Sequence, residues 1–208
     1  MTSFADPRRF LYRDNALDPD TALRLTAEAL KGCDDGELYL QYMAAESFGF
    51  DDGRLKTADF NTQAGFGLRG VSGETTAFAH ANDLSEAAIR RAAETMALLD
   101  PAAQAIAAPP RRTNAKLYTD EDPLGLIPFA RKVELCQTID AAARARDPRV
   151  SQVSVSLLGS WSVVEIVRPD GFVAFDVRPL VRLNVSVVVE QNGRRESGYY
   201  GTGGRFLY

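Results

Sequence analysis

The residue types that most often perform chemistry in proteins are scarce in this sequence. Its 208 residues include one histidine, His80, and two cysteines, Cys33 and Cys136. A zinc site takes several His, Cys or carboxylate ligands, and neither an HExxH nor a CxxC spacing occurs. A Ser-His-Asp triad would have to use His80, and no GxSxG motif accompanies it. The residues of this chain therefore predict neither a zinc site nor a serine hydrolase.

Three carboxylates, Glu46, Asp51 and Asp52, lie close together around a predicted turn. Paired carboxylates can act as general acid and general base when their surroundings separate their pKa values. Aspartate before glycine is also ordinary turn chemistry. One hypothesis is therefore a self-contained enzyme built on Glu46, Asp52 and His80, which requires the three side chains to converge in one pocket. The alternative is a solvated turn together with a structural histidine.

Four arginines in the last third of the chain could form a basic surface. They are Arg178, Arg182, Arg194 and Arg195. Arg182 falls on the polar side of an alternating segment, and the Arg194-Arg195 pair follows a predicted turn. Solvated residues that protect an edge strand explain this pattern.

The least ordinary segment is the glycine-rich run 198–206, which ends in Gly203-Gly204-Arg205-Phe206. Glycine lets a ligand or another backbone approach closely, and free amides beside Arg205 could hold a peptide carboxylate or carbonyl. Neither GxGxxG nor GxxxxGK[ST] is satisfied. We predict that Gly203, Gly204 and Arg205 lie on a substrate path; a flexible connection is the alternative.

An α+β fold with three helices is predicted to position these residues. The first helix follows Asp18-Pro19 and runs to Gly32, with Leu23, Ala27 and Leu30 as its apolar face. The second is capped by Asn82-Asp83 and stops before Asp100-Pro101. The third runs from Pro128 to Asp147-Pro148, and its predicted apolar positions are Phe129, Val133, Cys136 and Ala143.

The rest of the pattern predicts antiparallel, hairpin-rich strands. Extended segments are expected at 37–50, 54–61, 65–71, 74–81, 153–157 and 181–189. The predicted hairpin turns are Asp52-Gly53, Ser72-Gly73, Asp170-Gly171 and Asn192-Gly193. The similar order of elements in possible halves 18–100 and 127–206 suggests a duplicated helix-plus-strands unit within one domain, 1–208. A Pro/Ala-rich connection, 101–127, would join the halves.

Composition narrows the classes of partner and compartment. There are 24 Lys and Arg against 28 Asp and Glu, a net charge of −4, which disfavours direct binding to nucleic acid. No apolar run long enough for a signal peptide or a membrane span is present, so no membrane partner and a cytoplasmic location are expected. In a reducing compartment, Cys33 and Cys136 are interpreted as small apolar residues.

Two blocks of sequence resemble the amino-terminal domain of the TldD/PmbA family, specifically its TldD branch. The first block comprises 37–40 (ELYL), 46–47 (ES), 52–56 (DGRLK), 65–69 (GFGLR), 72–74 (SGE) and 78–83 (FAHAND). The second comprises 176–183 (DVRPLVRL) and 201–206 (GTGGRF). The resemblance runs over nearly the whole chain, in order and without large gaps.

This resemblance implies a zinc metallopeptidase subunit, a family also described as a modulator of DNA gyrase. It implies a heterodimer with a PmbA (TldE)-type partner and the proteolysis of unfolded peptides, including peptide maturation. In the family, a His-Glu-x-x-x-His motif follows the Gly-Gly-Arg-Phe segment in a carboxy-terminal metallopeptidase domain, which places the motif beyond Tyr208. The resemblance therefore implies that this chain, without catalytic or metal residues and without a cofactor of its own, helps to form the peptide cleft and subunit contacts.

A different class of function remains open beside this one. A stand-alone peptide-binding or protein-interaction module could use a sheet edge to add an extended peptide as a further strand. Such a module predicts peptide affinity without any further domain.

Overall fold

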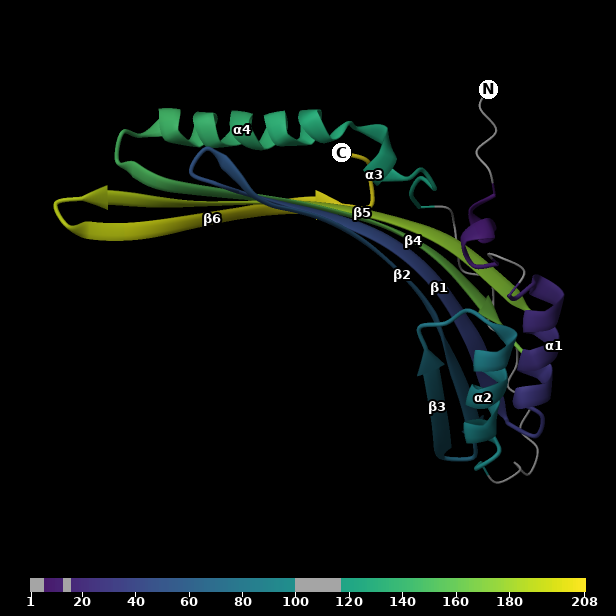
Figure 1. Ribbon diagram of the computed structural model, residues 1–208. Coiled ribbons are helices and arrows are strands. Elements are labelled where there is room, and N and C mark those ends of the chain that lie inside the picture. The colour runs from purple at the N-terminus through teal and green to yellow at the C-terminus, as the bar shows by residue number, and fades with distance from the viewer. Residues whose placement is uncertain (1–5, 13–15, 100–116) are drawn as a thin grey trace. The chain divides into compact units, whose positions relative to one another are not determined.

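The computed structural model describes residues 6–12, 16–99 and 117–208. Its centre is one six-stranded antiparallel sheet with the strand order β3-β2-β1-β4-β5-β6 (Figure 1). The strands are β1 Asp35–Asp51, β2 Arg54–Ser72, β3 Thr75–Ala81, β4 Val150–Val167, β5 Val173–Gln191 and β6 Arg194–Gly204. Three strands from each half of the chain therefore run outward from the central β1/β4 pair, and the predicted α+β class is confirmed.

Tight turns join the strands where the sequence predicts them. Gly53, Gly73 and Gly171 have positive φ angles of 72°, 56° and 88°, and glycine adopts that conformation without a steric penalty. Asn192 and Gly193 both have positive φ, the conformation of a two-residue hairpin turn. One division was wrong: segments 54–61 and 65–71 belong to a single strand, β2. Polar residues and glycine do not interrupt a strand whose backbone hydrogen bonds to the adjacent strand continue past them.

The chain forms two compact units whose segments alternate along the sequence. The first unit takes the described residues of 1–43, 63–115 and 162–177, and the second takes those of 44–62, 116–161 and 178–208. These units differ from the sequence halves 18–100 and 127–206, whose status as a repeat remains a prediction. Of the predicted connection 101–127, residues 101–116 lie outside the described residues, and α3, Pro123–Leu126, occupies part of the rest.

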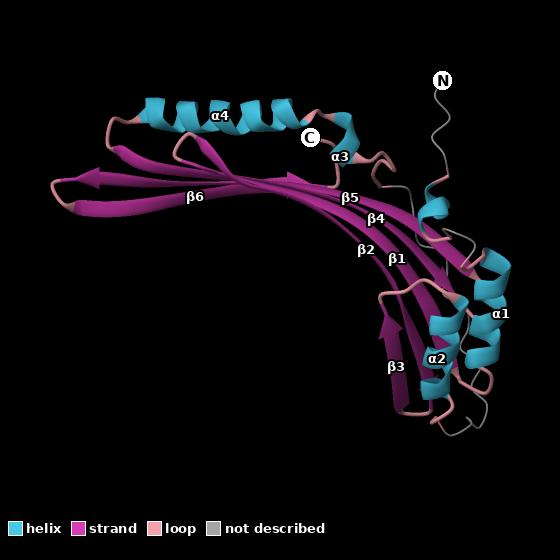
Figure 2. Cartoon of the chain, viewed as in Figure 1, coloured by secondary structure: helices cyan, strands magenta, loops and turns pink. Residues whose placement is uncertain are grey.

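In the first unit, helices α1 (Pro19–Ala29) and α2 (Glu86–Met96) contact each other, and α2 contacts β3 (Figure 2). Asp18 caps α1 as predicted, accepting a hydrogen bond from the Thr21 amide at 2.9 Å. The short 3₁₀ helix Pro7–Phe10 belongs to the same unit.

Two details of these helices differ from the prediction. The buried residues of α1 are Ala22, Leu25 and Thr26, together with Leu30 after its end, whereas Ala27 is exposed. The cap of α2 is Ser85, whose hydroxyl accepts from the Ala88 amide at 3.2 Å, instead of Asn82-Asp83. The sequence of α1 is compatible with more than one buried face, and that of α2 with more than one capping residue. Packing against the neighbouring elements determines which face and which cap form.

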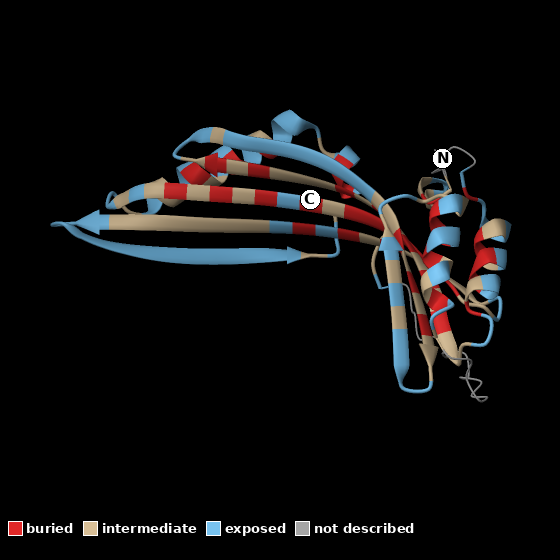
Figure 3. Cartoon of the chain, turned by 60° about the horizontal axis from the view of Figure 1, so that its bottom comes forward, coloured by how far each residue is buried: buried red, intermediate tan, exposed pale blue. Residues whose placement is uncertain are grey.

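In the second unit, α4 (Phe129–Arg146) lies along one face of the sheet (Figure 1). The core between them is made of Phe48, Phe50, Cys136, Val153, Val155 and Leu157. Among the described residues, no helix of this unit covers the opposite face, which we call the open face. Figure 3 shows the β5/β6 hairpin largely exposed or half-buried near its turn.

The buried side of α4 is unusual because it includes two charged residues. The buried positions are Lys132, Cys136 and Asp140, one turn apart, while Phe129 is 56% exposed. Of the predicted apolar positions, Cys136 is buried, and Val133 and Ala143 are half-buried against the core, whereas Phe129 is largely exposed. The predicted face did not include the buried Lys132 and Asp140.

Candidate functional site

The Glu46 carboxylate is buried in the second unit as half of an ion pair. The Lys132 ammonium donates to Glu46 Oε1 at 2.5 Å and to the Leu124 carbonyl at 2.8 Å, and it lies 4.9 Å from the centre of the Tyr208 ring. Burial, followed by the nearby Glu46 charge, raises the pKa of Tyr208. Burial raises the pKa of Asp122 in the same cluster. Within this cluster the two buried charges, Lys132 and Glu46, are paired with each other.

Asp51 and Asp52 each have partners elsewhere in the second unit. Asp51 Oδ1 accepts from the Ser154 hydroxyl at 2.6 Å, and this bond lowers the pKa of Asp51. Asp52 pairs with Arg144 of α4 at 2.5 Å. Neither shares a contact with Glu46, so these contacts do not support an acid/base pair of carboxylates.

His80 belongs to the first unit, where its ring stacks on Phe78 with the centroids 5.7 Å apart. It lines a groove of about 450 Å³, a volume within the range of small-ligand sites. Glu37, which pairs with Arg69 at 2.6 Å, lines the same groove. The described contacts of His80 include no carboxylate that would orient it, so they do not support the self-contained enzyme.

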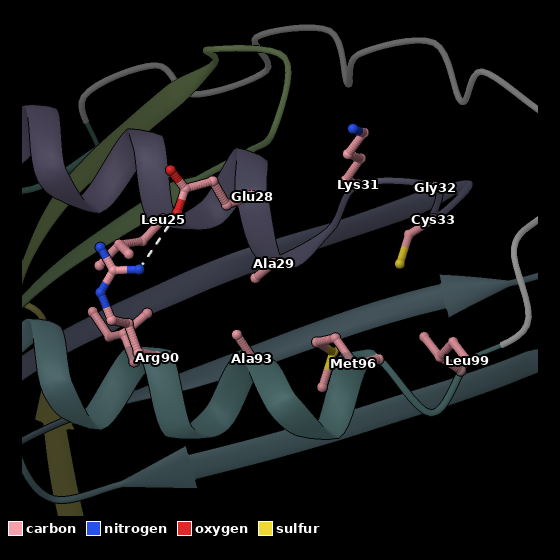
Figure 4. Close-up of a pocket in the computed structure, with 12 residues that line it drawn as sticks. Leu25, Glu28, Ala29, Lys31, Gly32, Cys33, Arg90, Ala93, Met96 and Leu99 are labelled. Carbon is pink, nitrogen blue, oxygen red and sulfur yellow. Dashed lines mark ion pairs between the residues drawn. The ribbon is translucent and has the colours of Figure 1, made fainter.

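A second groove of the first unit, of about 420 Å³, lies between α1 and α2 (Figure 4). Cys33 and Met96 bring sulfur atoms to its lining, and Arg90 pairs with Glu28 at 3.6 Å. Burial raises the pKa of the Cys33 thiol, which lowers its thiolate fraction and hence its reactivity.

The predicted substrate-path residues lie at the end of β6 in the second unit. Gly203 faces Arg182 across the β5/β6 ladder, and Gly204 faces Val181. Arg205 follows β6, with its guanidinium carbon 5.2 Å from the centre of the Tyr118 ring, a cation–π distance. The structure thus places the three residues at the edge of the sheet, with Arg205 stacked on an aromatic ring.

The four predicted basic residues have different partners. Arg194 pairs with Glu196 at 2.6 Å and Arg195 with Glu190 at 3.3 Å, as expected for solvated edge residues. Arg182 instead donates to two neutral groups, Asn184 Oδ1 at 2.9 Å and the Tyr199 hydroxyl at 3.2 Å. It lines a groove of about 560 Å³ on the open face. From the sequence, Arg182 was interpreted as a solvated edge residue. The alternation along β5 correctly predicted that it lies on the polar side of the strand, but gave no sign of its neutral partners.

The metal implied by the family resemblance finds no donor set here. Among residues 6–12, 16–99 and 117–208, no three His, Cys, Asp or Glu side chains gather where they could hold an ion. The described residues thus do not fit a zinc site. Within the same residues, no helix is both long and apolar enough to cross a lipid bilayer.

Two family models match the chain. The model described as PmbA/TldA metallopeptidase domain 1 matches residues 36–107, and the one described as the PmbA/TldA metallopeptidase central domain matches residues 122–208. The chain is 39% identical over 185 residues to the Metalloprotease TldD homolog of Haemophilus influenzae, and 37% identical over 177 residues to that of Buchnera aphidicola subsp. Schizaphis graminum. These alignments cover 85% and 84% of this chain, and 37% of each relative.

Solved structures share the fold. A protein of Bacteroides thetaiotaomicron, named as a candidate modulator of DNA gyrase, superposes with a TM-score of 0.74 at 16% identity over 94% of this chain and 46% of its own. TldE from Thermococcus kodakarensis gives a TM-score of 0.65 at 15% identity, over 89% of this chain and 43% of its own. At these identities the likeness concerns the fold alone.

Proposed function

The chain belongs to the PmbA/TldD metallopeptidase family, and from this premise we propose that it is a non-catalytic amino-terminal domain of a TldD-like zinc metallopeptidase subunit. The observation that carries the proposal is the 39% identity to a TldD homolog, which extends over 85% of this chain but only 37% of that protein. The chain thus spans about 37% of the length of these curated relatives.

In the proposed protein, the metal and the catalytic groups belong to a carboxy-terminal metallopeptidase domain. A metallopeptidase implies a metal ion, and we propose zinc. The described residues of this chain present no donor set, and the role proposed for the chain itself is to bind and orient peptide. Metal analysis of the chain alone that found about one tightly bound zinc per molecule would contradict this division of roles.

We propose that the chain contributes to a cleft for unfolded peptides and to contacts with a partner subunit. The exposed backbone of β6 and the glycine-rich end of that strand support the first role, since an extended peptide can approach a backbone that lacks side chains. The fold that this chain shares with TldE of Thermococcus kodakarensis supports a PmbA (TldE)-type partner. A role in peptide maturation in the cytoplasm is part of the same proposal.

Gly203, Gly204 and Arg205 are the proposed substrate-path residues. The test is Arg205→Ala in the assembled full-length protein with its partner subunit, measured by cleavage of an unfolded peptide. We expect slower cleavage, since the variant removes a cation beside the proposed path. The matched control is Arg194→Ala, an exposed arginine already paired with Glu196, which is expected to cleave normally. Unchanged cleavage by the Arg205 variant would show that this assignment is wrong.

The edge position of β6 also favours the second candidate function, a peptide-binding module. In such a module the bound peptide extends the sheet as an additional strand beside β6. Within the described part of the chain, β6 has only β5 as a neighbour in the sheet, and its residues are exposed from Arg194 to Gly203. This function predicts that the chain alone binds an extended peptide and that β6 amides become protected from hydrogen exchange. Protection that requires the full-length protein would favour the metallopeptidase domain instead.

A further inference from the structure

We propose that Arg182 forms an anion-binding site on the open face of the second unit, and that this site takes a side-chain carboxylate of an extended peptide. The inference rests on the proposed function for its choice of ligand, a peptide. It concerns a different arginine from Arg205, and a groove that the sequence did not reveal.

The first argument is that the Arg182 guanidinium is oriented but its charge is not neutralised. Its Nε and Nη2 atoms donate to Asn184 Oδ1 at 2.9 Å and the Tyr199 hydroxyl at 3.2 Å. The Tyr199 hydroxyl in turn donates to Asn184 Oδ1 at 2.6 Å, and Asn184 Nδ2 donates to the Ser156 hydroxyl at 3.0 Å. The oxygens that hold Arg182 are thus all neutral, whereas Arg194 and Arg195, at the turn end of the same hairpin, are each paired with glutamate.

The second argument is that the free donors have the geometry of a carboxylate clamp. A guanidinium carries five N–H donors in one plane, and the two bonds to Asn184 and Tyr199 leave the donors of Nη1 and the second donor of Nη2. These form one edge of the fork, which matches the two oxygens of a carboxylate. Because Asn184 and Tyr199 already fix the side chain, binding loses less side-chain entropy than it would with a freely rotating arginine.

The third argument is that the glycine-rich strand is shaped to hold this network. A Cβ at position 201 would lie 2.7 Å from the Tyr199 hydroxyl and 3.0 Å from Asn184 Oδ1. A Cβ at Gly203, directly opposite Arg182, would lie 2.4 Å from the Val181 carbonyl oxygen. Glycine at position 201 therefore leaves the space that the Tyr199 hydroxyl and the Asn184 side chain occupy, and glycine at position 203 lets β6 approach the β5 backbone beside Arg182.

The fourth argument is the charge and chemistry of the groove around Arg182. Its volume is about 560 Å³. The lining includes a second cation, Lys56, and one anion, Asp51, whose carboxylate is already bound by Ser154. Hydroxyl groups of the lining can pair with a peptide backbone, and Leu158, 39% exposed, offers an apolar contact. An extended peptide with an acidic residue beside apolar ones complements this surface.

The experiment measures binding of two fluorescent peptides to the chain by polarisation. The first is acetyl-Ser-Val-Glu-Val-Glu-Val-Ser-amide, in which only side chains carry charge, and the second has Gln in place of Glu. The variants are Arg182→Gln and, as a matched control from the same hairpin, Arg194→Gln. Inorganic phosphate is added in a separate arm to test whether any small anion competes.

We expect the unmodified chain to bind the Glu peptide about tenfold or more tightly than the Gln peptide, since a bidentate pair with a carboxylate is stronger than a neutral hydrogen bond. Arg182→Gln should weaken binding of the Glu peptide to a similar extent and leave binding of the Gln peptide nearly unchanged. Arg194→Gln should bind like the unmodified chain. Millimolar phosphate should compete only weakly, because it lacks the peptide contacts.

Each contrary result has a separate meaning. Equal binding of both peptides by the unmodified and Arg182→Gln chains would overturn the carboxylate site but leave peptide binding, and hence the proposed function, in place. Binding of neither peptide would overturn the site and also count against a peptide cleft on this chain. Phosphate that displaces the peptide completely at equal concentration would show a small-anion site in place of a peptide site.

Discussion

At the scale of single residues, the most consequential feature is the buried Lys132–Glu46 pair, whose side chains are only 3% and 9% exposed. A buried ion pair contributes little net stability compared with apolar residues, yet breaking it is costly because one charge is left without a partner. The pair joins α4 to β1 of the second unit.

The first prediction is that Lys132→Met destabilises the fold by about 3–5 kcal/mol, since it leaves the Glu46 carboxylate buried and unpaired. The measurement is the free energy of unfolding in urea. The double variant Lys132→Met with Glu46→Gln should recover part of the loss. Arg131→Met is the matched control, because its pair with Glu134 is exposed on both sides; a similar loss in this control would show that helix composition, not the buried charge, is responsible.

The second prediction concerns Asp147 at the end of α4. Arg149 donates to its carboxylate from the side chain at 2.9 and 2.6 Å and from the backbone amide at 2.9 Å, and these bonds lower its pKa to about 2. A folded-state pKa below the unfolded value means that the interaction stabilises the fold above about pH 4 and that this contribution is lost as the pH falls toward 2.

Carbon NMR of the side-chain carboxyl tests this value directly. Arg149→Gln should return the pKa of Asp147 toward its ordinary range. Gln191→Ala removes a different partner of Arg149, at 3.0 Å, and should leave the pKa of Asp147 low. A low pKa in the Arg149 variant would contradict the assigned cause.

At the scale of elements, the third prediction concerns the cap of α2. Ser85→Ala should cost about 1 kcal/mol of unfolding free energy, because the Ala88 amide loses its side-chain acceptor. Asn82→Ala, at the cap position expected from sequence, should change stability by less than about 0.5 kcal/mol. The reverse order in thermal or urea unfolding would restore the sequence-based cap.

The fourth prediction concerns the packing of the Tyr208 side chain against Gly159 of β4. A Cβ at Gly159 would lie 2.0 Å from the Tyr208 hydroxyl and 2.7 Å from Leu124 Cδ2, so Gly159→Ala must displace both and should cost about 1–3 kcal/mol. Gly125→Ala is the control, since its nearest atom would be 3.8 Å away.

A double variant tests whether the steric cause is correct. If the clash with Tyr208 dominates, Gly159→Ala should cost clearly less in a Tyr208→Ala background than in the unmodified chain. Equal costs in both backgrounds would assign the effect to Leu124 or to the strand itself.

At the scale of the whole molecule, the sheet places β1 and β4 at its centre and β3 and β6 at its edges. Central strands have hydrogen-bonding neighbours on both sides, whereas an edge strand leaves a row of backbone groups without a strand partner. The backbone amides of β1 and β4, two strands far apart in the sequence, are therefore the best protected from solvent.

The fifth prediction follows from this order. In hydrogen exchange monitored by NMR, the amides of β1 and β4 should be the slowest to exchange and the outward-facing amides of β6 among the fastest of the sheet. Measurements at two protein concentrations supply the control. If the β6 amides exchange slowly, and more slowly still at the higher protein concentration, β6 pairs with a second copy instead of remaining an exposed edge.

Much of the fold was accessible from short windows of sequence. The turns at Asp52-Gly53 and Asn192-Gly193 were predictable because they require positive φ, which few residues adopt easily. The alternation of apolar and polar residues from Val181 to Val189 likewise determined which side chains of β5 share a face. The cap of α2 and the complete buried faces of α1 and α4 were less predictable, because several choices satisfied the same local pattern.

The sequence by itself determined the α+β class, the turns and the family, because these depend on local conformation and on motifs read in order along the chain. Only the tertiary structure decided which distant side chains meet. Lys132 reaches Glu46 across 86 positions, and Arg144 reaches Asp52 across 92. It also showed that Arg182 has neutral partners while Arg205 stacks on Tyr118. Such partnerships depend on strand register and helix rotation, which the packing of the whole core sets and no short window of sequence contains.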